Sequence, residues 1–510
     1  MSNHTERKVE ILDTTLRDGE QTSGVSFTAT EKLTLAKLLL NELKVDRIEV
    51  ASARVSEGEF EAVKSIVKWA TQNKLSNKVE VLTFLDNGQS LQWLLQSKVK
   101  VQNILSKGSL NHLKHQLKQT PSQHFQKVKQ SIESANDHGI ISNVYLEDWS
   151  NGMKHSRQYV LDYIEFLAAQ KTKRILLPDT LGILNPSQLS DYLTEILELY
   201  PHTHFDFHGH NDYDFGVANA FEAVKVGIHG LHLTINGMGE RAGNAPLESV
   251  VVVIKDFLPS IKINVDESAL FRVSKLVATL SGIHIPKNKP VVGANVFTQT
   301  AGIHADGDKK NDLYFNDLLP ERFSRSRRYD LGKTSGRANI EKNLQELGLT
   351  LDEDQIKKVT KRVIELGDKK EQVSIEDLPF IISDVLGNGD DKIVRIKSFV
   401  LTHSKGLKPS TSVSVQIGEK LFEENASGDG QYDAFWSALN KIYSRQKMNL
   451  PELVDYFVRI PPGSSSDSLC ETTITWQDSK KQFRTRGLDS DQTVSAIKAT
   501  EKMLNIIYGS

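Results

Sequence analysis

One pattern recurs along the chain from Val9 to about Leu258: a short apolar run, a polar turn, and then a longer segment with the apolar spacing of a helix. The runs that we predict as strands cover residues 9–14, 47–52, 79–85, 101–105, 143–149, 174–180, 204–210 and 230–236. About eight strand–helix units in about 250 residues are typical of a TIM barrel. The repeat therefore predicts an α/β fold built on a (β/α)8 barrel.

An open, doubly wound sheet is the alternative fold for such a repeat. It would normally carry a glycine-rich phosphate-binding turn after its first strand, and here residues 16–20 read Leu-Arg-Asp-Gly-Glu instead. The helical segments carry ordinary start signals, such as Thr28 followed three residues later by Glu31. We therefore favour the closed barrel.

Length and composition restrict the class of protein. A chain of 510 residues suggests two or three domains. A formal net charge of -2 gives no overall field that would attract nucleic acid or an anionic membrane. The polar start and the absence of a long apolar run predict a cytoplasmic protein without a membrane span. With Cys470 as the only cysteine, a bound metal would need histidine, carboxylate, amide or water ligands.

The periodicity changes after the barrel. Residues 287–336 are rich in Gly, Asn, Asp and basic residues and predict an irregular linker, followed by helices at 337–347, 352–366 and 375–384. Beyond about residue 390 we predict strands at 392–402, 410–417, 453–460 and 471–476, with helices opening near Gly428 and Asp491. This part predicts an α+β domain that could be a duplicated unit with one helix per half. The expected domains are 1–285, 286–389 and 390–510.

Two histidines define the strongest candidate site. Alternate side chains of a strand face the same way, so His208 and His210 can share a cation. A lone His-x-His pair is more often solvated, but the ends of the other predicted strands also carry acids and bases. These strand-end residues are Arg17, Asp18, Glu147, Asp148, Asp179, Thr180 and the segment 236–244. In a barrel they would meet on the one face where active sites lie.

Three motifs together resemble a known family. Leu-Asp-Thr-Thr-Leu-Arg-Asp-Gly-Glu-Gln at 12–21, the His208/His210 pair and Asn-Gly-Met-Gly-Glu-Arg-Ala-Gly-Asn at 236–244 are similar to the metal-dependent Claisen-condensing enzymes. That family includes isopropylmalate, homocitrate and citramalate synthases, and the resemblance covers nearly the whole chain. Segments 144–152 and 177–182 resemble the citramalate synthase branch most closely.

The resemblance implies a site for a divalent cation, with Mn, Zn, Mg and Co left open. Its ligands would be Asp18, His208 and His210, with Asn244 close by. The cation would bind a 2-oxo acid and polarise its carbonyl. Arg17 would neutralise an oxyanion, although a salt bridge that closes the barrel rim is the simpler reading of this residue.

The same resemblance implies acetyl-CoA as co-substrate, Glu147 as the base that deprotonates its methyl group, and Thr180 as a donor to the substrate carboxylate. His304, in the linker, would activate the thioester or the attacking water. The loop 306–314, which contains paired lysines at 309 and 310, would hold coenzyme A. The coenzyme-binding residues expected there are Asp306, Leu313 and Tyr314.

The choice of 2-oxo acid depends on Leu82, Leu105 and Tyr145, which resemble the specificity positions of the family. These bulky residues favour the methyl group of pyruvate, which predicts (R)-citramalate synthesis for isoleucine biosynthesis. The alternative is 2-isopropylmalate synthase, which uses 2-oxoisovalerate for leucine biosynthesis. A retro-aldol acyl-CoA lyase is less favoured, because lyases of this kind use a cysteine in a loop beside the barrel, whereas Cys470 lies far downstream in the sequence. A non-catalytic metal-binding protein is also less favoured, because it would be expected to have altered acid and ligand positions, and these positions are intact.

The C-terminal domain is expected to sense a branched-chain amino acid and to form a homodimer. The segment 428–433 resembles the effector-domain motif of the family. Helix N-terminal amides would meet the carboxylate of the effector, and Asp433, next to Tyr432, would meet its ammonium group. A helix cap in a dimerisation domain is the simpler reading of this motif.

Overall fold

The computed structural model describes residues 7–308, 313–314, 316–368, 373, 375, 378–386, 393–459, 470–478, 482–489 and 491–508. Predictions for residues 309, 310, 390, 392 and 460 lie outside these ranges. The chain forms two compact units: one extends to Phe297 and includes Asn316–Arg327, and the other contains Thr298–Phe315 and Arg328–Ser510. None of the helices in the described ranges is both long and apolar enough to cross a membrane.

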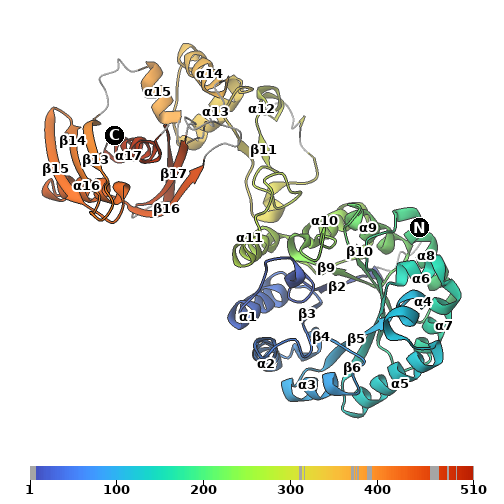
Figure 1. Ribbon diagram of the computed structural model, residues 1–510. Helices are drawn as coiled ribbons and strands as arrows, with labels where there is room; N and C mark the ends of the chain where they lie inside the picture. The colour runs from blue at the N-terminus through green and yellow to red at the C-terminus, as the bar shows by residue number, and fades with distance from the viewer. Residues whose placement is uncertain are drawn as a thin grey trace. The chain divides into compact units, whose positions relative to one another are not determined.

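Eight parallel strands close into a barrel in the first unit, and helices form a ring around it (Figure 1). The strands are β2 (Glu10–Asp13), β3 (Arg47–Ser52), β4 (Val79–Thr83), β5 (Val101–Lys107), β6 (Ile141–Glu147), β7 (Arg174–Asp179), β8 (Phe205–Gly209) and β9 (Gly230–Leu233). The closed order confirms the predicted TIM barrel and rules out the open sheet.

The outer helices bury their apolar faces against the strands. They are α1 (Ala29–Lys37), α2 (Glu57–Gln72), α3 (Gln89–Ser97), α5 (Pro121–Asp137), α7 (Arg157–Ala168), α8 (Pro186–Leu199), α9 (Gly216–Val226), α10 (Leu247–Phe257) and α11 (Leu270–Ser281). The start signal of α1 works as expected: the Thr28 hydroxyl accepts a hydrogen bond from the Glu31 amide, and the Glu31 carboxylate accepts one from the Thr28 amide.

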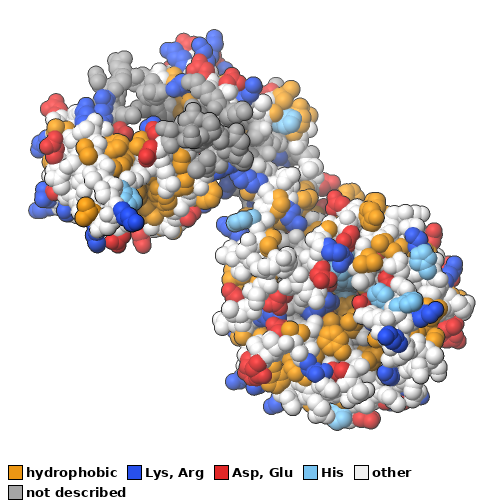
Figure 2. All heavy atoms as spheres, viewed as in Figure 1, with side chains coloured by type: hydrophobic (Ala, Val, Ile, Leu, Met, Phe, Trp, Pro, Cys, Tyr) orange, Lys and Arg blue, Asp and Glu red, His pale blue; other side chains and the backbone are white. Residues whose placement is uncertain are grey.

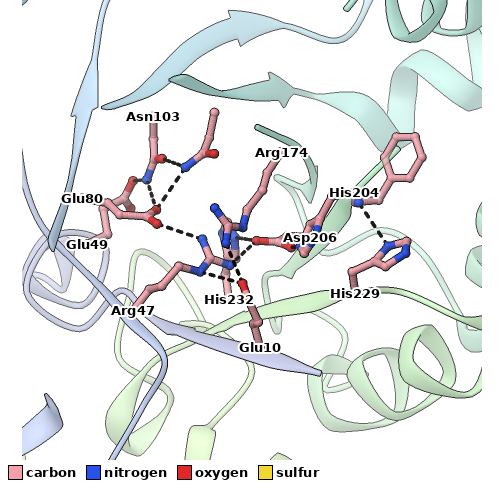
Figure 3. A network of polar contacts seen from close by, with 12 residues as sticks. Glu10, Arg47, Glu49, Glu80, Asn103, Arg174, His204, Asp206, His229 and His232 are labelled. Atoms are coloured by element: carbon pink, nitrogen blue, oxygen red, sulfur yellow. Dashed lines mark hydrogen bonds and ion pairs between the residues drawn. The ribbon is translucent and has the colours of Figure 1, made fainter. Parts of the chain in front are cut away.

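The interior of the barrel is polar, which differs from the branched apolar layers usual for this fold. Figure 3 shows one connected network to which each strand from β2 to β9 contributes. The Arg47 guanidinium pairs with Glu10 at 3.2 Å, with Glu80 at 3.0 Å and with Asp206. Further members are Glu49, Asn103, Asn143, Arg174, His204 and His232. Pairing of every charge is what allows such groups to be buried.

The second unit begins with short elements and a helical part. The linker is less irregular than predicted, since helix α12 (Gly302–Asp308) forms inside it despite its glycines. Three helices follow: α13 (Arg337–Leu347), α14 (Glu353–Asp368) and α15 (Leu378–Leu386). Ile340, Val359, Val363 and neighbouring apolar side chains form a separate small core between them.

The C-terminal part is a duplication in which three antiparallel strands and one helix occur twice. Its elements are β13 (Val394–Thr402), β14 (Ser410–Ile417), β15 (Lys420–Ser427), α16 (Gln431–Arg445), β16 (Glu452–Arg459), β17 (Cys470–Gln477), β18 (Gln482–Asp489) and α17 (Gln492–Tyr508). Both helices share one apolar core, which includes Phe435, Trp476 and Met503. The sequence reading placed two strands in each half and missed β15 and β18.

Candidate active site

Three side chains at the carboxyl ends of β2 and β8 come together as a candidate metal site. Asp18 lies in the turn after β2, His208 lies on β8, and His210 follows β8 directly. One potential ligand atom from each residue lies within 4.8 Å of the others, and the His208 Nε2–Asp18 Oδ2 distance is 3.1 Å. All three side chains are buried. The structure therefore brings the predicted ligands together.

The unpaired atoms of this cluster fit a divalent cation. His208 Nδ1, His210 Nδ1 and Asn244 Oδ1 are buried and have no hydrogen-bond partner among the described residues. Burial, followed by the nearby His208, lowers the pKa of His210 to about 4, so its imidazole is neutral and able to ligate. Burial raises the pKa of Asp18, but the Arg17 guanidinium and the hydrogen bond from His208 hold it well below its usual range. Two imidazoles beside a carboxylate are a suitable donor set.

Arg17 lies beside the cluster in a fixed orientation. Its Nε donates to Glu49 Oε2 at 2.6 Å, one terminal nitrogen lies 3.3 Å from Asp18 Oδ2, and the other donates to the Tyr145 hydroxyl at 3.3 Å. Lys32 supports the turn that carries Arg17, because its fully buried ammonium donates to the Leu16 carbonyl at 3.0 Å. The sequence reading missed Glu49 and Lys32, although a lysine on the apolar face of α1 was a visible signal.

A small apolar cluster lies apart from the main core of the barrel. It consists of Leu82, Tyr145 and Leu176, with Leu105 packed against them. Leu105, Tyr145 and Leu176 occupy neighbouring register positions on β5, β6 and β7. In Figure 2, histidine and charged side chains surround hydrophobic ones at the centre of the barrel. The three predicted specificity residues are therefore together, and Leu176 is a fourth member that the sequence reading missed.

Glu147 ends β6 and forms a close ion pair with Lys107, which ends β5. The predicted base is thus at the rim of the barrel, and Lys107 is an additional charged residue that was not foreseen. The Thr180 hydroxyl accepts a hydrogen bond from the Asp148 amide at 2.9 Å and keeps its own proton available for donation. The Asp179 carboxylate instead accepts the amides of the loop after β7, at Ile183 and Leu184.

The other predicted residues lie in the second unit. The rings of His304 and Tyr314 are 4.3 Å apart, and Asp306 belongs to the same helix as His304. Leu313 and Tyr314 are exposed. Their roles toward coenzyme A stay predictions.

The two predicted effector residues make different contacts inside the C-terminal domain. Asp433, in the first turn of α16, accepts a hydrogen bond at Oδ2 from the Asp429 amide at 2.8 Å, just before the helix. The Tyr432 hydroxyl is 2.7 Å from Thr500 Oγ1 on α17, and its ring is 5.2 Å from that of Tyr456 on β16. Tyr432 therefore links the two halves of the duplication, whereas the Asp433 contact is local, and the role of both residues toward an effector stays a prediction.

A buried histidine behind the Lys107–Glu147 pair gives a pH-dependent stability. Burial, followed by Lys107, lowers the pKa of His124 to about 4, and its Nδ1 lies 3.1 Å from the Tyr159 hydroxyl. The unfolded chain takes up this proton below about pH 6.5, before the folded chain does, so stability is lost as the pH falls from there toward 4. Lowering the pH from 7 to 5 should cost about 2 kcal/mol through this residue.

Urea denaturation at both pH values would measure this effect in the parent chain and in a His124→Gln variant, which cannot titrate. The pH dependence of the variant should be smaller by that amount. Equal pH dependence in the two proteins would show that His124 does not contribute.

Comparison with known proteins places these features in context. Residues 8–277 match the family described as HMGL-like, 291–371 the homocitrate synthase post-HMGL domain-like family, and 372–508 the LeuA allosteric (dimerisation) domain. A probable 2-isopropylmalate synthase from Methanopyrus kandleri is 33% identical over 98% of this chain and 98% of its own length. An (R)-citramalate synthase from Methanocaldococcus jannaschii is 32% identical, over 98% and 99%. A 2-isopropylmalate synthase from the same organism is 30% identical, over 98% and 95%.

Proposed function

The chain belongs to the HMGL-like family and carries the LeuA allosteric (dimerisation) domain, and from this premise we propose that it is an acyltransferase that condenses acetyl-CoA with a 2-oxo acid. The observation that carries the proposal is the buried cluster of Asp18, His208 and His210 with Arg17 beside it. The relatives named above as citramalate and isopropylmalate synthases support the reaction class.

Each residue has a distinct role in the proposed reaction. When bound by Asp18, His208 and His210, a divalent cation supplies Lewis-acid polarisation of the keto group. Arg17 stabilises the negative charge that develops on the keto oxygen, because its guanidinium is already oriented by Glu49. Glu147 accepts the proton from the acetyl methyl group, the resulting carbanion attacks the keto carbon, and the alkoxide so formed takes up a proton to give the hydroxyl group of the product. Water then hydrolyses the thioester and releases coenzyme A.

We propose pyruvate as the 2-oxo acid and (R)-citramalate as the product, which would serve isoleucine biosynthesis. The support is the apolar cluster of Leu82, Leu105, Tyr145 and Leu176, whose bulky side chains favour a methyl group over an isopropyl group. A larger pocket would gain about 0.8 kcal/mol of binding free energy for each additional methylene that it buries. A pocket already filled by bulky side chains cannot gain this free energy. The 2-isopropylmalate synthase activity is the second candidate, since relatives of both names are nearly equally similar.

A free-thiol assay of coenzyme A release tests both levels of the proposal. The specificity constant for pyruvate should be at least about tenfold higher than that for 2-oxoisovalerate. This is the factor expected when the two additional carbons of 2-oxoisovalerate do not fit the pocket. The reverse preference would reassign the chain to isopropylmalate synthesis. Absence of thiol release with every 2-oxo acid in the panel would contradict the reaction class.

The C-terminal duplication is proposed to form a homodimer that senses isoleucine. Exposed apolar side chains on its strands, among them Val400, Leu421, Val454 and Phe457, support an interface. Asp433 is the proposed partner of the effector ammonium group. Replacing Asp433 by Asn keeps an oxygen that can accept from the Asp429 amide but removes the charge, so isoleucine should bind about 10- to 100-fold more weakly.

Titration calorimetry with isoleucine on the full chain would measure this change. An Asp455→Asn variant, which alters an exposed carboxylate on β16, is the matched control. Undiminished binding and inhibition in the Asp433→Asn variant would place the effector elsewhere.

A further inference from the structure

His232, on β9, connects the polar interior of the barrel to the active site. Its Nε2 lies 3.1 Å from Asp206 Oδ2, inside the network of Figure 3, and its Nδ1 lies 2.8 Å from the Tyr145 hydroxyl. The side chains of His232 and Asp206 are fully buried, and Tyr145 is nearly so. The imidazole thus lies between a buried carboxylate and a residue of the apolar cluster.

The positions of the protons in this chain of contacts follow from its chemistry. The Asp206 carboxylate pairs with the Arg47 guanidinium and lies 2.9 Å from His204 Nε2, so it acts as an acceptor. His232 Nε2 must therefore carry a proton. The Arg17 guanidinium can only donate, and it is directed at the Tyr145 oxygen at 3.3 Å, so the hydroxyl keeps its own proton for another acceptor. The nearer acceptor is His232 Nδ1 at 2.8 Å, compared with Glu49 Oε2 at 3.5 Å. The Tyr145 hydroxyl consequently donates to His232.

This direction decides what Tyr145 offers the active site. With its proton directed at His232, the phenol oxygen turns its lone pairs toward Arg17, which donates to it at 3.3 Å. The ring itself packs against Leu82 and Leu176. The hydrogen bond from Tyr145 to His232 therefore fixes the position of the Tyr145 ring in the apolar cluster. It also fixes the phenol oxygen that helps to orient the Arg17 guanidinium group.

We propose that His232 is a positioning residue that acts through Tyr145 to set affinity for the 2-oxo acid. The inference deepens the proposed function and rests on it. Asp206 in turn fixes the tautomer of His232, so the interior network determines how the pocket wall is held. A purely structural role, in which His232 only satisfies the buried Asp206 carboxylate, is the competing explanation.

Two amide substitutions separate these explanations. In His232→Asn, the shorter side chain brings its amide to the position of the imidazole Nδ1, where it can accept from Tyr145. In His232→Gln, the longer side chain brings its amide to the position of Nε2, where it can donate to Asp206. Each substitution is made both in the parent chain and in a Tyr145→Phe background. Steady-state KM for the 2-oxo acid and for acetyl-CoA, kcat and melting temperature are measured on the full chain.

If His232 acts through Tyr145, His232→Gln should raise KM for the 2-oxo acid about tenfold, the size of one net hydrogen bond, and leave KM for acetyl-CoA within about twofold. In His232→Asn, KM for the 2-oxo acid and KM for acetyl-CoA should both stay within about threefold of the parent values. In the Tyr145→Phe background the two variants should become equal, because the coupling between neighbours is then removed.

The inference would be overturned if His232→Asn had the higher KM for the 2-oxo acid and the lower melting temperature, while His232→Gln resembled the parent chain. So would an equal rise of both KM values, or effects that persist unchanged without the Tyr145 hydroxyl. A parent chain that is inactive with every 2-oxo acid would overturn the proposed function and this inference with it, whereas an active parent with any of the preceding outcomes overturns the inference alone.

Discussion

Replacing His210 by alanine is expected to lower turnover by about 1000-fold or more while the barrel stays folded. A bound metal ion typically stabilises the transition state by several kcal/mol. Because about 1.4 kcal/mol corresponds to a tenfold change in rate, loss of the metal should lower turnover by about 1000-fold or more. His210 lies just beyond the end of β8 and is not part of the hydrophobic core, so its truncation should lower the stability of the barrel only slightly. The measurements are the thiol assay, the metal content of the purified chain and its melting temperature.

The matched control is His138→Ala, which removes an exposed histidine between the end of α5 and the start of β6, at the amino end of that strand. This variant should retain both metal and activity. Excess chelator should reproduce the His210→Ala result in the parent chain, and added divalent cation should reverse it. Full activity in excess chelator would exclude a metal-dependent reaction.

Glu147→Gln is expected to lower kcat by about 100- to 10,000-fold, which is the range for general-base catalysis. The amide keeps the shape of the side chain but cannot accept the methyl proton of acetyl-CoA. Metal content and affinity for the 2-oxo acid should be unchanged, because Glu147 lies on β6 and is not among the residues of the metal cluster.

The ion pair with Lys107 requires a second variant, since glutamine leaves that ammonium group without its carboxylate. The double variant Lys107→Met/Glu147→Gln removes the unpaired charge. Equal loss in the single and double variants would assign the effect to the missing base, and recovery in the double variant would assign it to the orphaned ammonium. A loss below about tenfold in both would transfer the base role to another residue, with His304 next.

The barrel could be predicted from the sequence because its signal is repeated and local. Each strand is a short apolar run followed by a helical segment, and the strand ends then place Asp18, His208 and His210 on one face without further information. The structure brings these three side chains together, whereas their role as metal ligands and the chemical roles of the other residues stay predictions.

The strands β15 and β18 were missed because their sequences lack a clear apolar period. The β15 sequence Lys-Leu-Phe-Glu-Glu-Asn-Ala-Ser, over Lys420–Ser427, has only one buried residue, and the strand is fixed by pairing with β14 rather than by burial. The interior network was missed for a different reason. Arg47 and His232 both meet the Asp206 carboxylate only when β3, β8 and β9 close into the barrel, and no local pattern records which inward residues will meet.

The interior network also restricts how this sequence can diverge over evolutionary time. Loss of one member, such as Arg47, leaves Glu80 and Asp206 buried without their cation, and breaking a buried pair typically costs about 3–5 kcal/mol. That cost is a large part of the stability of an ordinary domain. Because every barrel strand contributes a member, substitutions there should be fixed in compensating groups, so related lineages will differ at several of these positions together or at none of them.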